Sequence, residues 1–268
     1  MKNTKRPIGI FDSGLGGLTV LKQLQNQFPN ESFIYIGDTA HLPYGNKSAT
    51  TIINCSELIC DYLITQNVKL IIIACNTVSS LALKTIKKKF TLPIIDVITP
   101  VHHIVKKTPT VHKIGVIGTY NTIRSKAYYK TLKKANQNLQ IFEQPCPLFV
   151  PIIEEGLQDD LIADLAIKKY LGSLINNNIE LLILGCTHYP LLVQSIAKHI
   201  PNNIKILDSA SATAHYLKDY LLKHKLAGTK KRNADRLIIT DKAKNFKSLA
   251  TRILNQQDLV IELLNLTT

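Results

Sequence analysis

Two short aliphatic segments of this chain end in nearly the same sequence, and this repeat strongly limits the possible folds. Leu70–Thr77 reads LIIIACNT and Leu181–His188 reads LLILGCTH, each with a cysteine after four aliphatic residues and one small residue. A second pair, Ile8–Ser13 (IGIFDS) and Ile114–Thr119 (IGVIGT), has nearly the same separation along the sequence. Short aliphatic runs bounded by polar residues indicate buried strands, so one strand–helix pattern is used twice. If the two halves face each other, a cysteine approaches one ligand from each side, which suits a reaction that inverts a carbon centre.

Aliphatic runs alternate with amphipathic stretches from one end of the chain to the other. The predicted strands are Ile8–Phe11, Phe33–Ile36, Leu70–Ala74, Ile94–Val97, Lys113–Ile117, Gln140–Phe142, Leu181–Leu184, Ile204–Leu207, Leu237–Ile239 and Val260–Leu263. The predicted helices are Leu15–Phe28, Ser48–Gln66, Val78–Phe90, Thr122–Ala135, Leu157–Asn176, Leu191–His199, Ser211–His224 and Ala243–Asn255. Continuous aliphatic strands spaced by helices predict an α/β fold with buried parallel sheets and helices on both faces.

The chain of 268 residues is long enough for two modest α/β domains. Breaks near Thr99-Pro100 and after Asp208 place a second domain at 99–207. The last strands and helix then return to complete a first, discontinuous domain made of 1–98 and 208–268. Each domain is expected to hold a mostly parallel sheet, with the active site between the two.

Composition excludes several classes of protein. Apolar runs fall short of the roughly 18 residues that span a bilayer, and the basic N-terminus is followed by too short an apolar stretch for a signal peptide, so we expect a cytoplasmic protein. The five cysteines form no CxxC pair, which disfavours a zinc site or a disulfide framework. The net charge of +14 is spread over helix-like segments, with one denser stretch at Lys223–Arg236, and accompanies no nucleic-acid-binding motif. A solvated lysine-rich surface is the interpretation we adopt.

Polar residues follow five predicted strands at their carboxyl ends, where ligands bind in open parallel sheets. These groups are Asp12-Ser13, Cys75-Asn76-Thr77, Gly118-Thr119, Cys186-Thr187-His188 and Asp208-Ser209. Gly14–Gly17 fits neither nucleotide-binding pattern and predicts a tight strand-to-helix turn with exposed backbone N–H groups. A helix N-terminus after Cys75 or Cys186 would lower the thiol pKa from about 8.5 toward neutrality, and His188 could take or hold a proton there. Cys55, Cys60 and Cys146 read as ordinary buried small residues.

The motifs at these positions resemble the glutamate racemases of the cofactor-independent aspartate/glutamate racemase superfamily. The matching segments occur in the order of that family: Phe11–Leu18 (FDSGLGGL), Gly37–Ala40 (GDTA) with Pro43–Gly45 (PYG), Ala74–Thr77 (ACNT), Pro147–Pro151 (PLFVP) with Glu154–Gly156 (EEG), and Leu184–Leu191 (LGCTHYPL). The resemblance implies two α/β domains in pseudo-two-fold relation with glutamate between them. It also implies interconversion of L- and D-glutamate for peptidoglycan synthesis, with no cofactor and no metal.

The resemblance also implies a role for each matching residue. Cys75 and Cys186 would be the two acid/base thiols, with Asp12 assisting the first and Glu154 and His188 assisting the second. Substrate contacts would come from Asp12, Ser13, Pro43, Tyr44, Gly45, Asn76, Thr77, Thr119, Thr187 and His188. We also expect a homodimer that binds neither membranes nor nucleic acid.

Three alternatives remain open from the sequence. A member of the same superfamily could racemise aspartate or another amino acid. A hydrolase could use Cys186 as nucleophile and His188 as base, although Cys75 would then have no role. A basic nucleic-acid-binding protein would follow from the charge alone.

Overall fold

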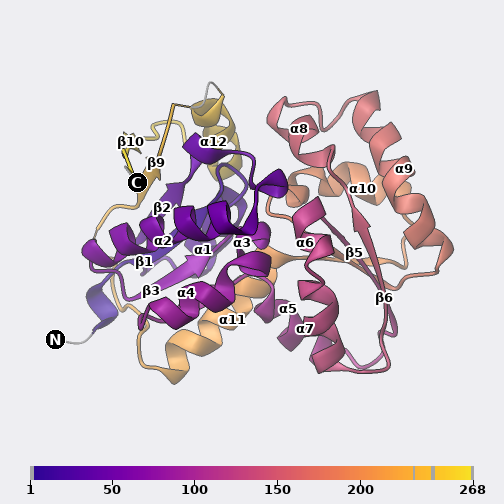
Figure 1. Ribbon diagram of the computed structural model, residues 1–268, viewed down its shortest axis with the longest axis horizontal. Coiled ribbons are helices and arrows are strands. Elements are labelled where there is room, and N and C mark those ends of the chain that lie inside the picture. The colour runs from indigo at the N-terminus through magenta and orange to yellow at the C-terminus, as the bar shows by residue number, and fades with distance from the viewer. Residues whose placement is uncertain (1–2, 232, 243–244, 267–268) are drawn as a thin grey trace.

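The computed structural model describes residues 3–231, 233–242 and 245–266. The chain forms two lobes, each built on a parallel sheet with helices packed on it (Figure 1). The predicted α/β class is therefore confirmed. The two lobes lie side by side, and the central strands of each, β1 to β3 and β5 with β7, are buried between its helices.

The larger sheet has the strand order β10-β9-β2-β1-β3-β4. Its strands are β1 (Ile8–Asp12), β2 (Phe33–Gly37), β3 (Leu70–Ile73), β4 (Ile94–Asp96), β9 (Arg236–Ile239) and β10 (Ile261–Leu263). All of the pairings are parallel, with Ile8 beside Phe33 on one side of β1 and beside Leu70 on the other. β9 and β10 come from a distant part of the chain and join this sheet beside β2.

The smaller sheet has the order β6-β5-β7-β8. Its strands are β5 (Lys113–Gly118), β6 (Gln140–Pro145), β7 (Leu181–Gly185) and β8 (Lys205–Asp208), again all parallel. β5 lies between β6 and β7, as β1 lies between β2 and β3. The repeat seen in the sequence therefore corresponds to equivalent central positions in the two sheets.

The helices connect these strands and cover both sheets. They are α1 (Leu18–Gln27), α2 (Ala49–Thr65), α3 (Asn76–Leu81), α4 (Leu83–Lys89), α5 (Thr99–Lys106), α6 (Tyr120–Arg124), α7 (Ala127–Ala135), α8 (Phe149–Glu154), α9 (Leu161–Asn176), α10 (Val193–His199), α11 (Ser209–Lys223) and α12 (Phe246–Leu254). Short 3₁₀ turns are η1 (Asn3–Lys5), η2 (Thr39–His41), η3 (Tyr44–Asn46) and η4 (Tyr189–Leu192). The predicted start of the last helix, residues 243 and 244, lies outside the described residues.

Several helix predictions need correction. The helix α5 was not predicted; it starts at Thr99-Pro100, where we place a domain boundary, because proline is favoured in the first helical turn. The predicted helix Val78–Phe90 divides into α3 and α4 at Ala82. The predicted helix Thr122–Ala135 divides into α6 and α7, since Lys126 adopts a left-handed conformation with φ 59°. The short helix α8 was not predicted.

Side-chain caps fix where several helices begin. Ser48 accepts a hydrogen bond from the N–H of Thr51 at the start of α2, and Asp208 accepts one from Ser211 N at the start of α11. Such caps satisfy N–H groups that the first helical turn leaves without partners. Because Asp208 is also the last residue of β8, the chain passes from strand to helix without an intervening loop.

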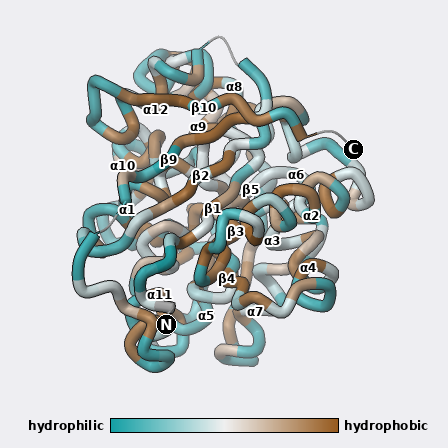
Figure 2. Tube along the Cα trace, turned by 90° about the vertical axis from the view of Figure 1, so that its left-hand side faces the viewer, coloured by the Kyte–Doolittle hydropathy of each residue, from teal (hydrophilic) through white to brown (hydrophobic). Residues whose placement is uncertain are grey.

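The core consists mainly of the strands themselves. β1, β2 and β3 are buried along their whole lengths, and they form brown, hydrophobic stretches through the middle of the tube in Figure 2. α11 follows a strand of the smaller sheet, yet its Ala214 and Leu217 pack with Leu21 of α1 in the core of the larger lobe. The chain returns to the larger lobe through this helix. The domain limits 1–98 plus 208–268 and 99–207 stay a prediction. Within the described residues, the helices are all too short or too polar to cross a bilayer.

Candidate active site

A cavity of about 270 Å³ lies where the carboxyl ends of strands from both sheets meet. The residues that follow β1, β3, β5 and β7 all contribute to its wall. Asp12 is the one predicted site residue that does not line the cavity, and its side chain is completely buried. The others line it together: Ser13, Pro43, Tyr44, Gly45, Cys75, Asn76, Thr77, Thr119, Glu154, Cys186, Thr187 and His188.

Cys75 is the N-cap residue of α3, and its thiol lies 3.7 Å from the Oγ of Ser13. Burial and then the nearby Asp12 carboxylate raise the pKa of the Cys75 thiol to about 12, although the Val78 N–H and the Ser13 hydroxyl lower it. The predicted fall of this pKa toward neutrality is therefore wrong. Desolvation penalises the thiolate more than the helix N-terminus stabilises it.

Cys186 lies at the end of β7 and belongs to a chain of three polar side chains. Its Sγ is 3.9 Å from Nδ1 of His188, and Nε2 of His188 is 3.1 Å from Oε1 of Glu154. Burial opposes protonation of His188, but hydrogen bonds and charge from Cys186 and Glu154 outweigh it and raise the His188 pKa to about 10. The imidazole therefore carries a positive charge beside Cys186 at neutral pH.

Asp12 supports the turn beneath the cavity. Its Oδ2 accepts a hydrogen bond of 2.9 Å from the N–H of Gly14, and Thr187 Oγ1 lies 3.5 Å from its Oδ1. The carboxylate thus connects the strand end that precedes Ser13 with the loop that carries Cys186. It also lies close enough to Cys75 to raise the pKa of that thiol.

Glycines let the turn after β1 approach the Cys186 loop. A Cβ atom on Gly16 would collide with the side chains of Thr187 and His188, and one on Gly17 would collide with Asp12. The turn predicted from Gly14–Gly17 is confirmed, because α1 begins at Leu18. These glycines are required by close packing rather than by a positive φ.

Hydroxyl groups from the two lobes meet on another side of the cavity. Thr77 Oγ1, at the start of α3, is 3.0 Å from Thr119 Oγ1. Thr119 is the N-cap of α6, and its hydroxyl accepts a hydrogen bond from Thr122 N at 3.3 Å. The pair places two hydroxyls and two helix N-termini at one wall, where an anionic group is favoured.

Tyr128 contacts both of the cysteine-bearing turns from below. Its hydroxyl donates a 2.7 Å hydrogen bond to Oδ1 of Asn76, which follows Cys75 in the sequence. Its ring lies against Gly185, which precedes Cys186, so closely that a Cβ there would be 2.9 Å from a ring carbon. Asn76 also donates from Nδ2 to Ser209 Oγ at 3.3 Å, so both ends of its amide are held.

The segment Pro43–Gly45 closes the cavity from the larger lobe. Tyr44 is buried, and its hydroxyl donates to the carboxylate of Asp38. From the smaller lobe, Asn121 Nδ2 donates to the carbonyl oxygens of Tyr44 at 3.2 Å and of Lys47 at 3.0 Å. The segment is therefore fixed by both lobes.

The sequence did not predict every wall residue. The sequence predicts Cys146 as a core residue; it is fully buried, but it also lines the cavity. The predicted strand ended at Phe142, three residues before the true end of β6 at Pro145, so Cys146 was not recognised as a strand-end residue. Further wall residues without a predicted role are Leu42, Asn46, Tyr120, Pro147, Val150, Pro151 and Glu155.

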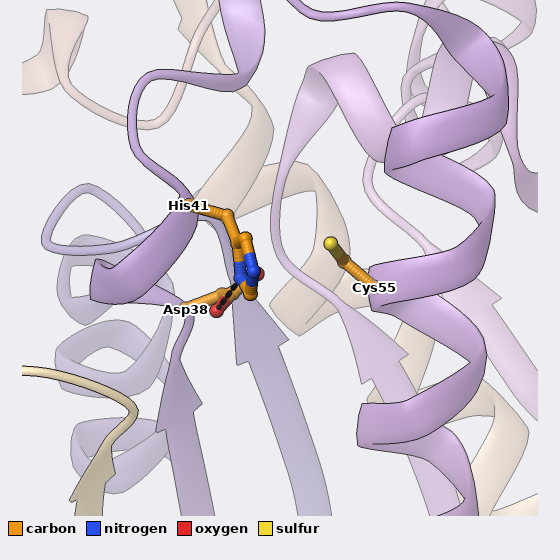
Figure 3. A group of neighbouring side chains, drawn as sticks. All are labelled: Asp38, His41 and Cys55. Atoms are coloured by element: carbon orange, nitrogen blue, oxygen red, sulfur yellow. Dashed lines mark hydrogen bonds and ion pairs between the residues drawn. The ribbon is translucent and has the colours of Figure 1, made fainter. Parts of the chain in front are cut away.

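Two other features lie away from this cavity. A larger cavity of about 500 Å³ is lined by Lys5, Arg6 and Arg236 among others, near the amino ends of strands in the larger sheet. Asp38, His41 and Cys55 form a group of possible metal ligands outside the cavity wall (Figure 3), and the Tyr44 hydroxyl donates to Asp38. Neither feature contains Cys75 or Cys186, so the cavity between the lobes is the candidate active site.

The cavity brings together one thiol from each lobe, a protonated imidazole and a set of hydroxyl and N–H donors. Such a site can exchange protons with an anionic ligand from two directions. An α/β fold of two similar lobes with these paired motifs defines a class of racemases. The chain belongs to the Asp/Glu/hydantoin racemase family, whose sequence model matches residues 8–217.

Close relatives carry a more specific name. The chain is 46% identical over 244 residues to a glutamate racemase of Sulfurihydrogenibium sp. (strain YO3AOP1), covering 91% of this chain and 92% of that protein. It is 44% identical to a glutamate racemase of Persephonella marina, with 97% of each covered. The crystal structure of the Francisella tularensis glutamate racemase in complex with D-glutamate has a TM-score of 0.91 and 41% identity, with 98% of each chain covered. The resemblance inferred from the motifs is confirmed.

Proposed function

We propose that this protein is a glutamate racemase, which interconverts L- and D-glutamate by two-base proton transfer at Cα. The observation that carries the proposal is the meeting of Cys75 and Cys186, one from each lobe, in the wall of one cavity. Relatives named as glutamate racemases over nearly the whole chain support the choice of glutamate. The product would supply peptidoglycan synthesis in the cytoplasm.

One thiolate would remove the Cα proton and become a thiol, while the other thiol would give its proton to the opposite face of Cα. One S–H bond forms, one S–H bond breaks, and the configuration at Cα is inverted. The reverse reaction exchanges the roles of Cys75 and Cys186. No redox change and no external reactant is involved.

The difficult step is the removal of a weakly acidic Cα proton. The negative charge that develops on the α-carboxylate would be stabilised by fixed donors in a site with little water. Ser13, Asn76, Thr77, Thr119 and Thr187 line the cavity and supply such donors. Because these groups are held by hydrogen bonds within the protein, they need little rearrangement as charge develops.

The neighbours of each thiol would determine how its proton moves. The imidazolium of His188, held by Glu154, lies beside Cys186 and can stabilise its thiolate. Asp12 lies near Cys75 and would favour its protonated form, so Cys75 must lose its proton when the cationic ammonium group of the substrate is bound. Two different environments would thus serve one reversible reaction.

The direct test is circular dichroism of pure L-glutamate or D-glutamate incubated with the purified protein, without pyridoxal phosphate, nucleotide or metal. We expect the signal to decay to zero from either enantiomer. The same assay with L-aspartate tests the alternative substrate. Persistent optical activity of glutamate with folded protein would reject the proposal. Loss of the aspartate signal alone would show that aspartate is the substrate.

We also propose that the protein forms a homodimer through an apolar surface at the start of α9. Leu161, Ile162 and Leu165 are 68%, 48% and 57% exposed, and Leu157 nearby is 38% exposed. Exposed clusters of large apolar side chains commonly mark protein interfaces, and a second copy of this chain is the partner we expect. Light scattering on the Leu161→Glu/Leu165→Glu double variant should show monomers where the unmodified protein shows dimers; unchanged dimers would exclude this surface.

A further inference from the structure

Behind the wall formed by Tyr44 lies a second group of reactive side chains that the proposed reaction does not use. Asp38, His41 and Cys55 come from the end of β2, from η2 and from the second turn of α2. One ligand-type atom from each lies within 4.8 Å of the others. In Figure 3 the sulfur of Cys55 points toward the paired Asp38 and His41 side chains.

The Asp38 carboxylate is the centre of this group. It is 1% exposed and accepts hydrogen bonds from His41 Nδ1 at 2.9 Å and from Thr240 Oγ1 at 2.7 Å, as well as from the hydroxyl of Tyr44. Cys55 is 7% exposed and faces this carboxylate, which together with burial raises the pKa of the thiol. The buried thiol therefore lies beside both the carboxylate and the imidazole.

We propose that Asp38, His41 and Cys55 form a binding site for a single Zn²⁺ ion. A thiolate, an imidazole and a carboxylate are each zinc ligands in proteins, whereas Ca²⁺ and Mg²⁺ require mostly oxygen ligands. Three protein ligands leave a fourth tetrahedral position for water, so the site would remain open on one side.

Only small movements are needed for coordination. Tetrahedral bonds of about 2.0–2.3 Å place two ligand atoms roughly 3.3–3.6 Å apart. The bonded atoms of Asp38 and His41, 2.9 Å apart, would therefore separate slightly to admit the ion. His41 can supply this movement, because its side chain is 36% exposed and lies in a short 3₁₀ turn. The thiol proton of Cys55 and any proton displaced from the bound nitrogen of His41 pass to solvent. The ion then replaces the His41 N–H as a partner of Asp38.

Tyr44 would connect the zinc site to the cavity, because it contacts both. The Tyr44 hydroxyl donates to the same carboxylate that would bind the ion, and Tyr44 and Gly45 line the cavity. Binding of zinc itself does not depend on the proposed racemase activity.

The test is titration of the metal-free protein with Zn²⁺ against a chromogenic chelator, with Co²⁺ absorption as a second readout. The Cys186→Ala background removes an active-site thiol that could bind zinc with His188. In that background we expect one equivalent of tightly bound zinc and a thiolate-to-cobalt charge-transfer band. Cys55→Ser should weaken zinc binding by ~100-fold or more and remove the band, because a direct ligand matters at least as much as its supporting partners.

Cys60→Ser is the matched control, since Cys60 lies on the same helix, is fully buried and is not part of the group. It should retain zinc binding and the cobalt band, and thermal melts should show that both serine variants are folded. Equal zinc affinity in Cys55→Ser and Cys60→Ser, or no stoichiometric zinc in the Cys186→Ala protein, would overturn the proposal.

Discussion

At the scale of single residues, burial disfavours the charged form at both ends of the site, and the neighbouring groups decide the outcome. It raises the pKa of the Cys75 thiol to about 12, with the Asp12 carboxylate acting in the same direction. At His188 burial alone would remove the proton, but Cys186 and Glu154 retain it and the pKa rises to about 10. One thiol therefore rests beside a negative charge and the other beside a positive charge.

Replacing either repeated cysteine should abolish racemisation. Cys75→Ala and Cys186→Ala each remove the proton carrier on one face of Cα, so we expect kcat to fall by ~10³-fold or more with glutamate. Cys60→Ala is the control: its thiol lies in the core away from the cavity, and its loss should cost about 1 kcal/mol of stability and leave kcat nearly unchanged. Near-normal turnover in either of the first two variants would contradict the two-base assignment.

The raised His188 pKa predicts how stability depends on pH. The imidazole pKa is about 10 in the folded protein and ~6.5 in the unfolded chain, so the folded state binds more protons between these values. Stability from this group is complete below pH ~6.5 and is lost as pH rises toward ~10.

Thermal melts of the unmodified protein and of His188→Asn at pH ~6 to ~9 test this expectation. The unmodified protein should lose melting temperature more steeply across this range than His188→Asn, in which asparagine cannot titrate. Parallel curves for the two proteins would show that His188 does not hold its proton in the folded state.

At the scale of secondary-structure elements, the turns from strand to helix build the site. Each one ends a strand of a parallel sheet and exposes N–H groups at the start of the next helix. The turns after β1 and β7 can approach each other only because Gly16 has no side chain. Tyr128 then supports the turns after β3 and β7 from a single helix, α7.

Tyr128 should therefore act as a positioning residue. Tyr128→Phe keeps the ring against Gly185 and removes only the hydrogen bond to Asn76 Oδ1, so the amide of Asn76 is held only by its bond to Ser209. A hydrogen bond of ~1 kcal/mol corresponds to a fall in kcat/KM of about five- to tenfold.

Steady-state kinetics in both directions and a thermal melt measure this effect. Tyr129→Phe is the matched control, because Tyr129 is the next residue on the same helix and is 40% exposed. If Tyr128→Phe lowers the melting temperature while kcat and KM stay unchanged, Tyr128 is only structural.

At the scale of the whole molecule, the two lobes place equivalent motifs on the two sides of one cavity. Each sheet contributes a central strand and a neighbouring strand that is followed by a cysteine, β1 with β3 and β5 with β7. Contacts such as the one between Thr77 and Thr119 hold the lobes together at the cavity wall. The reaction proposed here needs both lobes at once.

Proton transfer between two separate bases predicts an isotope pattern in D₂O. The thiol that donates has exchanged with solvent and gives deuterium to the new enantiomer, while the abstracted proton stays on the other cysteine. At low conversion, NMR should therefore show deuterium at Cα of the product and almost none in the remaining substrate. Substantial protium in the early product would indicate a single base and would remove the functional meaning of the repeat.

The sequence by itself determined the α/β class, the parallel strands and the family, because each of these depends on local order along the chain. Short aliphatic runs define buried strands wherever they lie, and the residues directly after them share one edge of a parallel sheet. Cys75 and Cys186 were recognisable for this reason, and both line the cavity. The ends of helices were less predictable, since proline at the start of α5 and the left-handed Lys126 have more than one local interpretation.

Only the tertiary structure decided the environments of these residues. The raised pKa of Cys75 follows from its burial and from the Asp12 carboxylate. The sequence does not show how deeply Cys75 is buried, and Asp12 is far from it along the chain. The support of Asn76 by Tyr128 and the grouping of Asp38, His41 and Cys55 also have no sequence motif. Charge, desolvation and hydrogen bonding act between groups that are close in space. The packing of the two sheets, and not the order of residues along the chain, determines which groups are neighbours.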